Sequence, residues 1–146
     1  MLDGIKLKHN QLKEVAEKFG IDLLLLFGSQ ATSKTHKNSD VDLAFLPNRD
    51  SVLIDESQLL IDLMEIFKRD DVEIVNLKVA SPTLMRAVVR DGTVLYEKEK
   101  DIFLKWKLYA TKIWMETSWL RSMRDRKLKE WAIARNKSSR PFQSSE

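Results

Sequence analysis

Two short apolar runs constrain the fold of this chain more than any other feature. The first run, residues 23–27, is bounded by Gly20 and Gly28, which is typical of a short buried strand. The second run, residues 41–46, ends at Pro47, a residue that interrupts strands. Because both runs are too short for buried helices, we predict two strands of one sheet.

Helical and strand-like patterns alternate along the rest of the chain. We predict an α/β (α+β) fold, in which helices pack on a mixed β-sheet and a helical extension follows at the C-terminus. Ser81 is a good N-cap and Pro82 is suited to the first helical position. The predicted helices are residues 10–19, 51–67, 81–90 and 101–135, and the remaining strands are residues 72–77 and 93–96.

The chain of 146 residues divides into three predicted parts. We expect a compact core over residues 1–100 and a helical extension over residues 101–135. Residues 136–146 are polar and rich in serine, so we expect a disordered tail.

The composition excludes several classes of site. The chain has no cysteine, which rules out disulfides, thiol catalysis and cysteine-bound zinc and fits a cytoplasmic protein. His9 and His36 are its only histidines, so a histidine-rich metal site is poorly supported. No apolar run approaches the roughly 18 residues of a membrane span, and the N-terminus lacks the pattern of a signal peptide.

Charge and aromatic residues are unevenly distributed. Residues 1–100 carry 14 Lys and Arg against 17 Asp and Glu, whereas residues 101–146 carry 11 against 5. The basic end fits nucleic acid or an acidic protein as a partner, and it equally fits a solvated helix surface. It also holds Trp106, Trp114 and Trp119, with Trp131 further on, and we expect these to be covered either by the sheet or by a partner subunit.

The chemistry is concentrated where the first two strands meet. Gly28 and Ser29 follow the first strand, and free backbone N–H groups at such a turn favour an anion such as a triphosphate. After a spacer of ten residues, Asp40 and Asp42 open the second strand, where residues two apart project from the same face. Paired carboxylates repel each other unless a cation lies between them, and Mg²⁺ is the natural one.

A third carboxylate is expected on the strand at residues 72–77. Glu73 is the first choice because it interrupts an apolar run, and Asp71 is the fallback. Taken alone, Glu73 could equally be a charge on an edge strand that deters aggregation. An isolated Gly-Ser is usually an ordinary turn and cap, and an isolated Asp-x-Asp is usually solvated or a strand-end cap. The order and spacing of all these pieces favour a functional site.

The segments 27–31 (Phe-Gly-Ser-Gln-Ala) and 39–43 (Ser-Asp-Val-Asp-Leu) resemble the signature of the minimal nucleotidyltransferases of the DNA polymerase beta superfamily. The resemblance extends from about residue 12 to the segment 90–96 (Arg-Asp-Gly-Thr-Val-Leu-Tyr). It implies a βαβαβ core and the chemistry of an Mg²⁺-dependent transfer of a nucleoside monophosphate from an NTP such as ATP.

The resemblance also implies roles for individual residues. Asp40, Asp42 and Glu73 would hold two Mg²⁺ ions, and Gly28 and Ser29 would contact the triphosphate. The third carboxylate would orient or deprotonate the acceptor hydroxyl. The family usually has Asp where Glu73 stands, which puts its metal geometry and turnover in question. Three further residues of the loop, Lys34, His36 and Lys37, could touch phosphate.

Small stand-alone members of this type resemble the antitoxin of HEPN/MNT toxin–antitoxin pairs. That likeness implies transfer of AMP onto a tyrosine of a separate HEPN-family toxin, because an Arg followed closely by His, as in HEPN proteins, is absent here. The alternatives are a small-molecule acceptor and an antitoxin that binds its toxin without catalysis. DNA polymerase activity and a membrane role are not expected, and nucleic acid is not favoured as a direct substrate.

Overall fold

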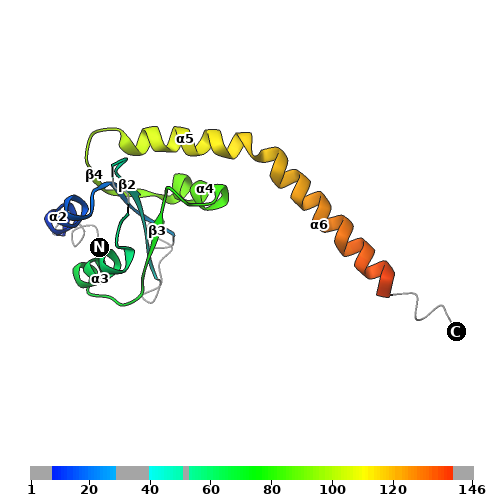
Figure 1. The fold of residues 1–146 in the computed structure, drawn as a ribbon, viewed down its shortest axis with the longest axis horizontal. Coiled ribbons are helices and arrows are strands. Elements are labelled where there is room, and N and C mark those ends of the chain that lie inside the picture. The colour runs from blue at the N-terminus through cyan, green and yellow to red at the C-terminus, as the bar shows by residue number, and fades with distance from the viewer. Residues whose placement is uncertain (1–7, 29–39, 51–52, 140–146) are drawn as a thin grey trace. The chain divides into compact units, whose positions relative to one another are not determined.

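The computed structural model describes residues 8–28, 40–50 and 53–139, in which helices α2, α3 and α4 pack against a four-stranded sheet (Figure 1). The elements are α2 (His9–Phe19), β1 (Ile21–Phe27), β2 (Val41–Pro47), α3 (Glu56–Phe67), β3 (Val72–Asn76), α4 (Pro82–Asp91), β4 (Thr93–Glu97), α5 (Ile102–Glu116) and α6 (Ser118–Ser139).

The sheet is mixed, as the sequence predicts. Its strand order is β3-β2-β1-β4, with β1 antiparallel to both of its neighbours and β2 parallel to β3. A parallel pair needs a crossover, and α3 supplies the one between β2 and β3. This order brings together, at one end of the sheet, the C-terminal end of β1 and the starts of the other three strands.

Both faces of the sheet are covered at β1, which is buried along nearly its whole length. On one face, Leu24 and Leu26 join a core cluster with residues of α2 and α3, including Leu12 and Leu59. Side chains alternate along a strand, so Leu25 points to the opposite face. There α4 contacts β1 and buries its own Met85 and Val88.

Two helix starts follow from capping. Ser81 caps α4 as predicted, because its Oγ accepts a hydrogen bond of 3.2 Å from the backbone N–H of Leu84. The helix predicted from residue 51 begins only at Glu56. Asp55 is its N-cap, and Oδ1 of Asp55 accepts a hydrogen bond of 3.1 Å from Gln58 N–H. The prediction placed this start too early because apolar periodicity does not reveal which polar residue makes the cap.

The helical stretch predicted over residues 101–135 is divided at Thr117 into α5 and α6. Arg121 holds this junction. Its Nη2 donates to the carbonyl of Trp114 at 2.6 Å, its Nη1 donates to Thr117 Oγ1 at 2.8 Å, and its guanidinium carbon lies 3.3 Å from the centre of the Trp114 ring. A side chain of α6 therefore ties the last turn of α5 to the first turn of α6.

The chain forms two compact units, residues 1–111 and 112–146. In the second unit, α6 continues to Ser139, beyond the point at which the predicted tail begins. The predicted division at residues 100 and 135 stays a prediction. Among the tryptophans, Trp106 is buried, Trp114 is half-buried, and Trp119 and Trp131 are exposed. Within the described part of the chain, no helix has the length and apolarity needed to cross a bilayer.

Candidate active site

Gly28 lies directly after β1, at the end of the sheet where the other strands begin. Its φ is +76°, a left-handed conformation that an L side chain rarely adopts. A Cβ atom at this position would overlap Oδ2 of Asp42 and come within 3.3 Å of its Cγ. Glycine is therefore required here both by the backbone turn and by the carboxylate beside it.

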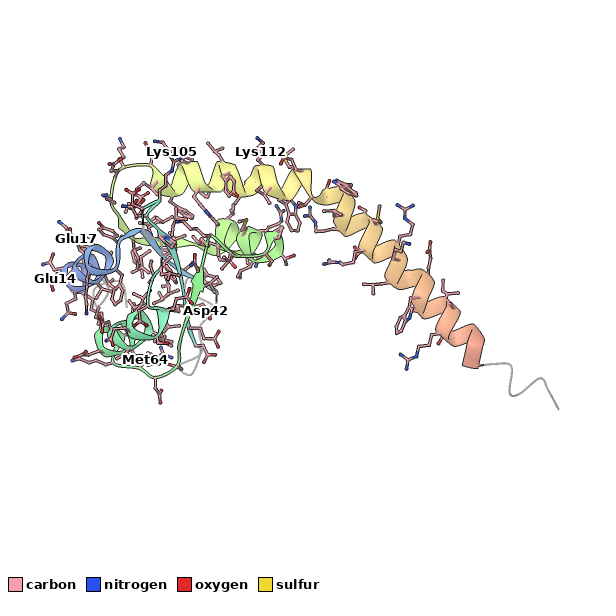
Figure 2. All side chains as sticks on the ribbon, in the orientation of Figure 1. Glu14, Glu17, Asp42, Met64, Lys105 and Lys112 are labelled. Carbon is pink, nitrogen blue, oxygen red and sulfur yellow. The ribbon has the colours of Figure 1, made fainter. Side chains whose placement is uncertain are left out.

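Asp42 is the second residue of β2 and pairs across the antiparallel ladder with Phe27, the residue before Gly28. Its side chain is labelled in Figure 2 at the end of the sheet, and the residue is half-buried. Asp40 precedes β2 and is exposed. The register of β1 and β2 thus places Asp42 beside the glycine turn, whereas Asp40 lies just outside the strand.

Glu73 lies beside Asp42 because the parallel register of β2 and β3 pairs these two residues. Burial raises the pKa of Asp42 above its ordinary value, and the charges of Glu73 and then Asp40 raise it further. A hydrogen bond with the Glu73 side chain adds to the increase in the pKa of Asp42. Glu73 itself is exposed, so its place on the strand costs less desolvation than the apolar pattern around it suggests.

Asp71, the fallback for the third carboxylate, is engaged elsewhere. Arg69 Nε donates to Asp71 Oδ1 at 2.7 Å, and Arg69 Nη2 donates to Oδ2 at 2.5 Å. These bonds lower the pKa of Asp71 below its ordinary value. The backbone carbonyl of Asp71 also accepts a 2.9 Å hydrogen bond from Val41 N–H. Because the guanidinium of Arg69 binds both oxygens of the Asp71 carboxylate, Glu73 is the carboxylate that faces Asp42.

Arg69 is a residue that the sequence analysis missed. Hydrogen bonding to Asp71 raises the pKa of its guanidinium, and the negative charges of Asp71, Asp40 and Asp70 contribute as well. A cation is thus within electrostatic reach of Asp40 at the acidic end of the sheet. In the sequence, Arg69 is marked only by its position two residues before Asp71, next to a predicted strand. An Arg and an Asp at this spacing are too common to indicate a contact.

The carboxylate oxygens of Asp42 and Glu73 suit a hard cation, but they do not form a complete metal site by themselves. Across residues 8–28, 40–50 and 53–139, no group of three or more His, Cys, Asp or Glu side chains is arranged to hold a metal ion. Asp42 and Glu73 nevertheless offer paired carboxylate oxygens whose mutual repulsion a cation would relieve. Mg²⁺ commonly takes one or two carboxylates and completes its shell with phosphate and water oxygens, so this pair fits it.

Part of the predicted phosphate site lies outside the described residues. Ser29 belongs to the segment 29–39, as do the loop residues Lys34, His36 and Lys37. Their roles stay predictions. Gly28 is the predicted phosphate contact that the structure describes, and it lies against Asp42.

A cavity of about 480 Å³ lies at the other end of the sheet. It is lined by α2, the start of β1 and the end of β4, and Tyr96 and Asp22 are among its residues. None of the carboxylates at Asp40, Asp42 or Glu73 lines it. We therefore place the chemistry at the acidic end of the sheet, because a polyphosphate needs the cation-binding groups and not merely a hollow.

Comparison with known proteins identifies relatives of this arrangement. The family model described as polymerase beta, nucleotidyltransferase, matches residues 10–101. A protein adenylyltransferase MntA of Aphanizomenon flos-aquae is 37% identical over 94 residues, which cover 58% of this chain and 63% of that protein. A protein adenylyltransferase MntA of Shewanella oneidensis is 33% identical over 81 residues, covering 56% and 58%. The match therefore spans less than two thirds of either relative.

Solved structures share the fold. A toxin–antitoxin crystal structure with AMP-PNP aligns with a TM-score of 0.66 and 24% identity, covering 82% of this chain and 98% of the matched chain. A complex of the tri-AMPylated HEPN toxin of Shewanella oneidensis with its MNT antitoxin aligns with a TM-score of 0.62 and 22% identity, covering 85% and 98%. At these identities the likeness establishes a common fold.

Proposed function

This chain belongs to the polymerase beta nucleotidyltransferase family, and we propose that it transfers AMP from ATP to a hydroxyl group of another protein. The observation that carries this proposal is the register of β2 and β3, which pairs Asp42 with Glu73 while Gly28 lies against Asp42. Two carboxylates and an open glycine turn at one end of a sheet suit a magnesium-bound nucleoside triphosphate.

Each residue has a distinct part in the proposed reaction. Asp40 and Asp42, together with Glu73, would hold Mg²⁺, with two ions implied by the family signature. When bound, Mg²⁺ neutralises phosphate charge. Gly28 would let the triphosphate approach the backbone, and Ser29 would add a hydroxyl donor to it.

Glu73 would accept the proton of the acceptor hydroxyl. The acceptor oxygen then forms a bond to the α-phosphorus of ATP, and the bond from that phosphorus to the bridging oxygen breaks. Pyrophosphate leaves with the bonding electrons, and AMP stays on the acceptor. Glu73 lies on β3, on the far side of β2 from Gly28, so nucleotide and acceptor would approach the Asp42 carboxylate from opposite sides.

We propose a tyrosine of a HEPN-family toxin as the acceptor, which would make this chain an antitoxin of the cytoplasm, where ATP is available. Support comes from the relatives named as protein adenylyltransferases and from the fold shared with the antitoxin of an AMPylated HEPN complex. The small-molecule acceptor and the binding-only antitoxin remain as distinct outcomes of the test.

The test incubates the chain with Mg²⁺ and α-labelled ATP, with and without the purified HEPN-family protein of the same genome. Label on that protein, abolished by Tyr→Phe substitution at its labelled site, supports the proposal. Inhibition of the toxin without label would replace it with the binding-only function. Label that appears only when a small hydroxyl compound is added would replace it with a small-molecule acceptor.

A further inference from the structure

We infer that α6 inserts into an acidic groove of the protein partner of this chain, and so selects that partner. The inference rests on the proposed function in one respect, namely that AMP is transferred to a protein. It concerns a part of the chain outside the proposed active site. The family model ends at residue 101, so α6 lies wholly outside the segment that defines the family.

Although α6 is rich in charged residues, it exposes several large apolar side chains to solvent. Six large apolar side chains are 43% to 60% exposed, and two of them are tryptophans. Six large exposed apolar side chains on one helix, two of them tryptophans, are typical of a surface that a partner covers. The six residues are Trp119, Leu120, Met123, Leu128, Trp131 and Ile133.

These side chains are spread widely around the helix. At about 100° per residue, they occupy a sector of roughly 220°, from Ile133 through Trp119 and Trp131 to Leu128. Figure 2 shows side chains projecting from both edges of α6. A helix that packs on a flat surface needs an apolar stripe of little more than about 100°. The wider sector fits a groove that surrounds more than half of the helix.

The charges of α6 indicate the chemistry of that groove. Residues 118–139 contain seven Lys and Arg against two Asp and Glu. Of the six cations in residues 118–136, four fall within the apolar sector at the same helical spacing, and Glu130 is the acidic residue among them. These four are Arg124, Arg126, Lys127 and Arg135. A groove that buries the apolar side chains must therefore present carboxylates to the interleaved cations.

Other occupants fit less well. Two copies of α6 would bring like charges together, which opposes pairing. A membrane surface requires the apolar residues to share one face, whereas the sector here exceeds half the circumference. Nucleic acid would use the cations and the tryptophans but would leave Leu120, Leu128 and Ile133 without apolar partners. An acidic protein groove uses both kinds of side chain.

Two lysines of α6 provide a matched test. Lys127 lies within the apolar sector, whereas Lys129 lies about 200° further around the helix, on the remaining polar strip. The variants Lys127→Glu and Lys129→Glu carry the same change in charge and are two residues apart. Trp131→Ala tests the apolar part of the surface.

The experiment measures the affinity of the full chain and its variants for the purified HEPN-family protein by titration calorimetry, with AMP transfer and AMP-PNP binding recorded in parallel. Circular dichroism verifies that each variant keeps its helices. We expect Lys127→Glu and Trp131→Ala to weaken the complex at least tenfold, and Lys129→Glu to change it less than threefold. AMP-PNP binding should not change in any variant.

Each other outcome has a definite meaning. Equal loss in the two lysine variants, or no loss in any variant, overturns the inference while normal transfer leaves the proposed function standing. Wild-type binding with the expected variant pattern but without AMP transfer supports the inference and contradicts the proposed function. Failure of the wild-type chain to bind overturns the inference. The inference is also overturned if the chain binds a single-stranded RNA oligonucleotide more tightly than the HEPN-family protein and Trp131→Ala abolishes that RNA binding.

Discussion

Gly28 and Asp42 are so close that a Cβ atom on the glycine would overlap the Oδ2 atom of the aspartate. Gly28 also has a φ of +76°, where a side chain costs about 1–2 kcal/mol. We therefore expect Gly28→Ala both to destabilise the fold and to displace Asp42, with AMP transfer reduced at least tenfold per folded molecule.

The control for this variant is Gly20→Ala, because Gly20 has a similar φ of +69° at the end of α2. It should lose comparable stability in thermal unfolding while keeping its transfer rate. Equal loss of transfer in the two variants would show that backbone strain, and not contact with Asp42, is responsible.

Replacing Asp42 should separate activity from folding. We expect Asp42→Asn to lower AMP transfer by several orders of magnitude, because it removes a proposed metal ligand while preserving the shape of the side chain. The same holds for Asp40→Asn. Unfolding in urea should remain cooperative in both, since a half-buried Asp42 with a raised pKa already costs the fold some stability when ionised. Near-normal transfer by either variant would refute the metal assignment.

Glu73 should show the chemistry of a carboxylate and not merely of a polar side chain. We expect Glu73→Gln to reduce AMP transfer about a hundredfold or more, because an amide cannot accept the acceptor's proton. Glu73→Asp should keep much more activity, since it retains the charge beside Asp42. Asp71→Asn is the matched control on the same strand region, because Asp71 is bound by Arg69. If Asp71→Asn matches the loss in Glu73→Gln, the third carboxylate is assigned to the wrong residue.

The junction between α5 and α6 should depend on Arg121. Arg121→Ala removes the hydrogen bond to the Trp114 carbonyl and the contact with the Trp114 ring, each worth about 1 kcal/mol. We expect faster amide hydrogen exchange at Thr117 and Arg121, whose N–H groups donate to Ile113 and Thr117. Arg124→Ala removes a more exposed arginine of the same helix and should leave those rates unchanged.

The contact between α2 and α3 should make stability depend on pH. Lys18 Nζ donates to Asp62 Oδ2 at 2.9 Å and Gln58 Nε2 donates to Oδ1 at 2.8 Å, and these bonds lower the pKa of Asp62 below 3.8. The ionised carboxylate therefore stabilises the fold above pH 3.8, and this contribution is lost as the pH falls through the folded-state pKa.

Asp62→Asn should accordingly lower the free energy of unfolding at pH 7, by a small amount because Lys18 is largely exposed. Below the folded-state pKa the variant and the wild-type chain should become equally stable. Urea unfolding at neutral and at strongly acidic pH measures both differences. A difference that stays constant with pH would mean that the charge of Asp62 does not contribute.

Much of the core was predictable because its signals are local. The apolar runs at residues 23–27 and 41–46 lie within β1 and β2, and Ser81 and Pro82 begin α4 as their capping chemistry requires. Helix α3 shows the limit of such signals: its apolar face identified the helix, while the choice of Asp55 as cap was visible only in the structure.

By itself, the sequence determined that two aspartates, two residues apart, lie at the start of a strand and that a glycine follows the strand before them. These features depend on neighbours along the chain. Only the tertiary structure decided that Glu73 faces Asp42, that Arg69 engages Asp71, and that Arg121 of α6 binds the end of α5. The first of these depends on strand register, which packing of the whole sheet fixes, and the others depend on side-chain directions that no local pattern specifies.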